Sequence, residues 1–467
     1  MRATKSLFTL SAVALLGATS AGAQTVVASA DVGGPDTTTA ATTDTTGTPT
    51  TKAAKKALLQ KAIVIQNYRP NDQRGLNVFE APKEAGVPFT GFKLDFGAAF
   101  TQQFQGLAHE NTAVLDPDGD GTAENQLMTI GQGFNLATAN LYVNAQLAPG
   151  IRVALTSYLS SRRHNETWVK DGYLLIDGSP IDQPLLNTVM EYVTIKAGHM
   201  ELNYGDQHFR RTDNGQALYN PFVGNLMLDA FTTEIGGEVY VRANGVLGMV
   251  GITDGVNKGD VTNPQRRTPG YYGKLGVDRQ LSDDVRVRLT GSLYAVQKTP
   301  SATLFNGDRA GSRYYMVLEN TAATIDGQAT SGNINPGLSN KLSAWQLNPF
   351  VKVRGLELFG VVERAEGRTT AETENRVWNQ YAVDGVYRLL DDQLYVGARY
   401  NTVAGQLRNV AQEVSADRTA FAAGWFITPS ILLKGEWVTQ KYNDFPTTDI
   451  RNGGKFDGFV VEGVVAF

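Results

Sequence analysis

The sequence predicts an all-β fold, a transmembrane antiparallel β-barrel of about 16 strands, with 18 as the alternative. Three observations predict it. Segments that alternate apolar and polar residues recur from residue 89 to 467. The connections between successive segments are alternately tight turns and long polar loops. No internal stretch holds the roughly 20 mainly apolar residues that a spanning helix needs. A closed barrel is the other structure that satisfies every backbone hydrogen bond inside a bilayer.

Residues 1–23 have the basic, apolar and small-residue regions of an export signal, in that order. Arg2 and Lys5 precede an uncharged apolar stretch, and the small residues Ala21, Gly22 and Ala23 precede the expected cleavage point. Removing this signal peptide takes the formal net charge from −4 to −6. Neither value suggests a nucleic-acid partner, which would require a clustered basic face. The absence of cysteine excludes disulfide frameworks and thiol chemistry.

Two segments separate the signal from the predicted barrel. Residues 24–52 are rich in Thr and Ala and are expected to form a flexible linker. Residues 53–88 are predicted to be a short periplasmic helix or a partial plug, with a plain linker as the simpler interpretation. Leu58, Leu59 and Ile63 favour a helix over residues 53–66, and prolines follow it.

Residues 89–467 carry the strand pattern. Phe92, Leu94 and Phe96 interleave with Lys93 and Asp95, and the same alternation returns along the chain. Turn residues separate pairs of these segments at Ala148-Pro149-Gly150, Asn244-Gly245, Ser282-Asp283-Asp284, Arg354-Gly355, Asp391-Asp392 and Thr428-Pro429-Ser430. If the last strand runs towards the periplasm, all the tight turns fall on that side, and all the long polar connections fall on the other.

One segment breaks the alternation. Val193 and Ile195 share one face of their strand, whereas Met200, Leu202 and Tyr204 share the opposite face. An extra residue in one strand would shift the phase in this way. The pattern therefore predicts a β-bulge near Gly198 that redirects the strand into the next loop.

The C-terminal strand carries a resemblance to a known family. Phe467, Val465, Gly463, Val461 and Phe459 form one apolar face. This resembles the closing strand of Gram-negative outer-membrane barrels, in which a terminal aromatic residue is the assembly signal. Residues 89–467 as a whole resemble a Gram-negative porin. The stretch from Gly198 to Asp206, followed by Arg210 and Arg211, is similar to barrels of the phosphate-selective class.

The resemblance implies several properties. The protein would lie in the outer membrane, in contact with lipid and lipopolysaccharide, after insertion by the barrel-assembly machinery. A homotrimer is implied too, although no sequence stripe identifies a subunit interface. The implied function is passive diffusion of small polar solutes or ions through a water-filled channel, because the side chains of about 16 strands cannot fill the interior.

The third long connection, residues 205–230, is the candidate constriction. Porins of this kind fold that loop into the lumen, although an ordinary surface loop is the alternative. Its candidate residues are Asp206, Arg210, Arg211, Asp213, Asn214 and Asn220, and the alternation assigns Arg288, Arg399, Lys434, Asp384 and Glu436 to the facing pore wall. Opposed charges on loop and wall would sieve polar solutes, and replacing Arg288 and Arg399 by Glu is expected to favour cations.

The first long connection contains metal-like spacing. Asp116, Asp118 and Asp120 alternate with Pro117 and Gly119, and Glu124 follows. Carboxylates at alternate positions before a glycine match the start of a calcium-binding loop, although Leu127 stands where such a loop places its bidentate Glu. The alternatives are a structural Ca²⁺ site and an acidic hairpin tip, since Asp and Gly also favour turns. No other cofactor is expected.

Enzymatic motifs are absent from the sequence, and no enzyme is expected. The chain has no His-Glu-x-x-His motif and no Gly-x-Ser-x-Gly elbow. A barrel hydrolase that uses His199 or His208 as the base is one alternative, because a triad is recognised by geometry rather than by sequence order. An outer-membrane structural or adhesion protein, tethered by the Thr-rich segment, is another.

Overall fold

A computed structural model describes residues 65, 68–81, 89–179, 181–262, 264–308 and 311–467. The signal peptide and the Thr-rich linker lie outside these residues. The expected helix over residues 53–66 does so too, apart from Ile65. Within the described residues, no helix is long and apolar enough to cross a membrane.

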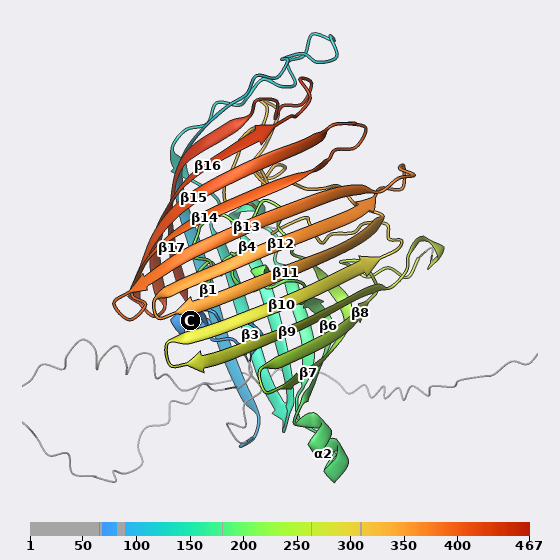
Figure 1. The fold of residues 1–467 in the computed structure, drawn as a ribbon, viewed down its shortest axis with the longest axis vertical. Helices are drawn as coiled ribbons and strands as arrows, with labels where there is room; N and C mark the ends of the chain where they lie inside the picture. The colour runs from blue at the N-terminus through green and yellow to red at the C-terminus, as the bar shows by residue number, and fades with distance from the viewer. Residues whose placement is uncertain (1–64, 66–67, 82–88, 180, 263, 309–310) are drawn as a thin grey trace, which may run out of the picture. The chain divides into compact units, whose positions relative to one another are not determined.

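The described chain forms one sheet of antiparallel strands, 16 of them long and one, β2, of two residues (Figure 1). The strands are β1 (Lys93–Glu110), β2 (Gly133–Phe134), β3 (Thr138–Ala148), β4 (Ile151–Ser160), β5 (Trp168–Ile176), β6 (Val193–Glu201), β7 (Thr233–Ala243), β8 (Val246–Thr253), β9 (Gly270–Ser282), β10 (Val285–Val296), β11 (Lys341–Val353), β12 (Leu356–Arg368), β13 (Arg376–Leu389), β14 (Leu394–Gln406), β15 (Glu413–Thr428), β16 (Ile431–Asn443) and β17 (Lys455–Ala466). The predicted all-β fold and strand number are confirmed.

The sheet closes through β1. The first half of β1 pairs with β3, from Lys93 opposite Gln146 to Thr101 opposite Thr138, and its second half pairs with β17 up to Glu110 opposite Lys455. Phe467, just beyond β17, exchanges two backbone hydrogen bonds with Ala98, of 2.9 and 3.0 Å. No long strand is left with a free edge in the described sheet, which is the condition for crossing a bilayer.

Alternation separates an apolar outer surface from a polar interior. On β13, Tyr381 and Val383 are 54% and 51% exposed, whereas their neighbours Gln380 and Asp384 are 0% and 2% exposed. On β9, exposed Leu275 adjoins buried Lys274 in the same way. The closed sheet therefore offers apolar side chains to lipid and buries polar ones within the barrel.

Short turns join the strands at one end of the barrel and long loops join them at the other end, as predicted. Asn244-Gly245 joins β7 to β8 with φ of 49° and 74°, the left-handed geometry of a tight hairpin turn. The predicted turns between β3 and β4, β9 and β10, β11 and β12, β13 and β14, and β15 and β16 are also present. The β5 to β6 connection departs from this rule, because it is longer and contains the helix α2 (Pro184–Met190).

The predicted bulge near Gly198 is wrong. β6 pairs with β5 and with β7 without a register shift. The phase changes because Val193 and Ile195 lie on the outer face, whereas Met200 is fully buried and the chain beyond it enters the core with Leu202 and Tyr204. When the apolar residues of a strand switch from the outer face to the protein interior, the sequence pattern looks the same as that of a β-bulge.

Candidate functional site

The third long connection lies inside the barrel. Nearly every side chain from residue 202 to 232 is buried. Backbone amides of the loop donate to wall side chains: Val223 to Glu436 at 2.9 Å, Met227 to Asn401 at 2.8 Å and Leu228 to Gln380 at 2.9 Å. The loop is thus held against the wall that β13, β14 and β16 form.

Two of the predicted wall cations lie beneath this loop. Lys434 donates three hydrogen bonds of 2.8 Å to backbone carbonyls of the loop and pairs with Glu462 at 2.8 Å. Arg399 pairs with Asp384 at 2.7 Å and donates to the Gly224 carbonyl at 2.9 Å. These charges are neutralised by close partners, so they fix the loop and do not face an open channel.

A second charged cluster surrounds Asp206. Arg288 donates to both of its carboxylate oxygens at 2.7 and 2.8 Å, and Lys274 lies at 3.0 Å. Thr290 donates at 2.7 Å. Burial by itself raises the pKa of Asp206, but Lys274 and Arg288 hold it below the usual range. The start of the loop is therefore anchored to β9 and β10.

The remaining predicted loop residues also have partners inside the barrel. Arg211 pairs with Asp229 at 2.6 Å, and Arg210 lies 3.3 Å from Glu357. Asp213 lies 2.7 Å from Lys170. Backbone and side-chain bonds link Asn214 to Asp308 and Asn140, and Asn220 to Thr212 and Asn225.

Residues 68–81 also lie within the barrel, which brings part of the predicted 53–88 segment against the wall. Near the short turns, the Gln73 side chain donates to the Asp392 carbonyl at 2.8 Å. Asn77 donates to Glu357, close to the Arg354-Gly355 turn, at 2.6 Å, and Glu80 lies 2.7 Å from Arg288. Burial raises the pKa of Glu80, but Lys274 and Arg288 outweigh it and lower this pKa to about 2.

Two sizeable cavities lie inside the barrel among the described residues. An outer cavity of about 550 Å³ lies among the ends of β4, β5 and β7 and the long connections 254–269 and 297–340, with Tyr158, Phe231 and Asp308 in its lining. An inner cavity of about 270 Å³ is bordered by residues 68–81, the third loop and the walls of β5, β6 and β7. Both lie along one side of the barrel, away from the wall that anchors the loop.

Lys170 is a functional candidate that sequence reasoning missed. In the β4 to β5 pairing, Thr156 faces Asp171 and Ser157 faces Val169, so Lys170 is the extra residue of a β-bulge. Lys170 and Asp171 are consequently both buried, at 8% and 6% exposure. A charged pair at successive positions of a strand was the available signal, because strict alternation would expose one of them.

His208, one of the two histidines considered for hydrolysis, does not belong to a serine triad within the described residues. His208 holds Glu201 at 2.9 Å through one ring nitrogen and Asn203 at 3.0 Å through the other. Burial lowers the pKa of His208. Its two ring nitrogens are therefore occupied by a carboxylate and an amide instead of a serine hydroxyl. His199 lies elsewhere, in the lining of a separate hollow that also includes Trp168 and Ile235.

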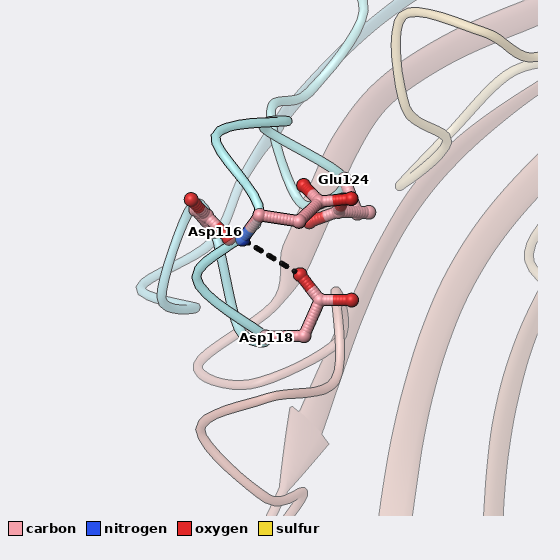
Figure 2. Close-up of side chains that lie close together, drawn as sticks. Asp116, Asp118 and Glu124 are labelled. Carbon is pink, nitrogen blue, oxygen red and sulfur yellow. Dashed lines mark hydrogen bonds between the residues drawn. The ribbon is translucent and has the colours of Figure 1, made fainter.

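The acidic loop brings its carboxylates together. One oxygen from each of Asp116, Asp118, Asp120 and Glu124 lies within 4.8 Å of the others. Figure 2 shows Asp116, Asp118 and Glu124 close together on this loop. Asp116 also accepts backbone hydrogen bonds from Gly119 and Gly121, and Asp118 accepts one from Asp120, as in an Asp-rich turn. The donor set suits Ca²⁺, and calcium binding stays a prediction.

Comparison with known proteins identifies the fold. No protein-family model and no curated protein sequence matches the chain. Among solved structures, the anion-selective porin from Comamonas acidovorans aligns with a TM-score of 0.51 and 12% identity, over 80% of this chain and 100% of that one. The outer membrane channel DcaP of Acinetobacter baumannii aligns with a TM-score of 0.46 and 9% identity, over 82% of this chain and 100% of that one. Pseudomonas putida OprB aligns with a TM-score of 0.47 and 10% identity, over 80% of this chain and 94% of that one.

At these identities, the similarity concerns the fold alone. The chain is a porin-like β-barrel, and its closed sheet and apolar outer surface are those of an outer-membrane protein. Function has to be argued from the interior, since one fold serves many activities.

Proposed function

We propose that the protein is an outer-membrane porin, a channel for passive diffusion of small polar solutes or ions. The observation that carries the proposal is a pair of cavities, with many charged and polar side chains in their linings, inside a closed barrel with an apolar outer surface. Water-filled interiors are expected for barrels of this strand number unless a segment fills them. Residues 205–230 form the constriction, and their polar side chains supply the sieve.

Residues 68–81 are the second narrowing element in this proposal. Their bonds to the turn that contains Asp392 at one end, and to Arg288 at the other, support a partial plug of the periplasmic half. The channel would then be narrowed from the outside by the third loop and from the periplasmic side by this segment, which favours small solutes.

Planar-bilayer recording on the purified full-length protein tests the function. We expect discrete conductance steps, together with swelling of protein-containing liposomes in solutions of small sugars or amino acids. Folded barrels that give no steps and no swelling would refute the porin proposal. They would favour the structural or adhesion alternative, or, if lipid or peptide substrates are cleaved, the hydrolase.

A further inference from the structure

Lys170 lies at the junction of the two cavities. It contributes to the lining of both, whereas their other described lining residues belong to one or the other. The bulge in β5 turns this side chain inward towards the third loop. A solute that moved from the outer cavity to the inner one would have to pass its ammonium group.

Ion pairs link the wall and the loop at this junction. Lys170 Nζ lies 2.5 Å from Glu201 at the end of β6 and 2.7 Å from Asp213 in the loop. Asp171 of β5 lies at 4.0 Å. The aromatic rings of Tyr158 and Phe231 flank the same ammonium. One cation thus faces three carboxylates, contributed by two strands and the loop.

On the opposite side, the cavity between the third loop and the described residues of β12, β13 and β14 holds only about 10 Å³. Ser292 of β10 is 2% exposed, and the arginines of that side are tied to Asp206 and Asp384 beneath the loop. We infer that solutes cross the barrel between β5 and the third loop, and that Lys170 sets the charge preference of this passage. The inference rests on the proposed channel function and names its selectivity residue.

Cysteine chemistry tests the route, because the chain contains no cysteine of its own. Lys170→Cys leaves Glu201, Asp213 and Asp171 without their ammonium, so its reversal potential in a salt gradient should move towards cations. Aminoethyl methanethiosulfonate should then restore a positive charge and move the potential back to the wild-type value. A sulfonatoethyl reagent should move it further towards cations. Ser292→Cys is the matched control and should not respond to either reagent.

Heat-modifiable migration on gels checks that each variant is folded. If Lys170→Cys does not fold, Lys170→Met should shift the reversal potential towards cations through loss of the charge alone. Lys352→Met is its control, since Lys352 lines neither cavity. An open wild-type channel whose folded position-170 variants keep its selectivity would overturn the inference, as would a Ser292→Cys channel that the reagents alter. A folded wild type without conductance would refute the proposed function itself, and the inference with it.

Discussion

At the scale of single residues, charged side chains in the interior act mainly as anchors. Arg399 and Asp384 are 6% and 2% exposed and bind each other at 2.7 Å, and Arg288 is equally enclosed. Removing the partner of a buried charge costs far more stability than removing the partner of a solvated charge, because the buried charge has already lost its hydration. We therefore expect Arg288→Glu and Arg399→Glu to lower the stability of the barrel, instead of changing its ion selectivity.

Removing one partner of a buried pair should destabilise the barrel. Arg399→Ala leaves Asp384 buried and unpaired, and we expect a loss of about 3–5 kcal/mol in the free energy of unfolding. Arg354→Ala is the control, since its pair with Asp284 is largely exposed, and it should cost less than about 1 kcal/mol. Urea unfolding in lipid vesicles, followed by tryptophan fluorescence, measures both. Equal losses would contradict the anchoring role.

The carboxylates of the first long connection give a second prediction at this scale. If they hold calcium, isothermal titration of the detergent-solubilised protein should show a binding event that Asp118→Asn weakens at least tenfold. The negative charge of the site falls by one in that variant, although Asn keeps one oxygen that can bind the ion. Asp283→Asn, in the turn between β9 and β10, is the control and should bind as the wild type does. An absent heat of binding would favour the acidic hairpin tip.

At the scale of elements, two inserted segments occupy part of the barrel interior. The third loop covers the wall from β9 to β16, and residues 68–81 cover part of the inner half. Both are held by side chains from many different strands. Each can therefore be tested by shortening it while the strands stay intact.

Shortening residues 205–230 should raise the conductance and admit larger solutes, because the backbone that fills the lumen is removed. Shortening residues 407–412, which join β14 to β15, serves as the control and should leave the conductance unchanged. Single-channel recording and liposome swelling with sugars of increasing size provide the measurements. A folded shortened loop with wild-type conductance and size limit would refute this constriction.

Deleting residues 68–81 should also raise the conductance if they form a partial plug. The deletion removes the contacts of Glu80 with Arg288 and Lys274 as well as the backbone of the segment. A deletion of equal length within residues 24–52 controls for the shorter N-terminal region. Conductance that is unaffected by the first deletion, in a barrel that still folds, would argue against a plug.

At the scale of the whole molecule, closure of the sheet depends on the last strand. Phe467 exchanges two hydrogen bonds with Ala98, and its side chain is 52% exposed on the outside. Deleting Phe467 should reduce the amount of heat-modifiable barrel in outer-membrane fractions, whereas Phe467→Tyr should preserve it. Equal amounts in all three proteins would contradict the assembly role. Light scattering of the same detergent extracts measures whether the implied homotrimer forms.

The sequence by itself determined the barrel. Alternation fixes which face of each strand meets lipid, and residues such as Asn244 and Gly245 fix the turns, because both are local properties of a few neighbouring residues. The tertiary structure decided how the interior is filled. The partners of Arg288 come from residues 80 and 206, far apart in the chain, and Lys170 points inward because a bulge breaks the alternation. Such contacts depend on which segments the closed barrel encloses, and no local pattern encodes that.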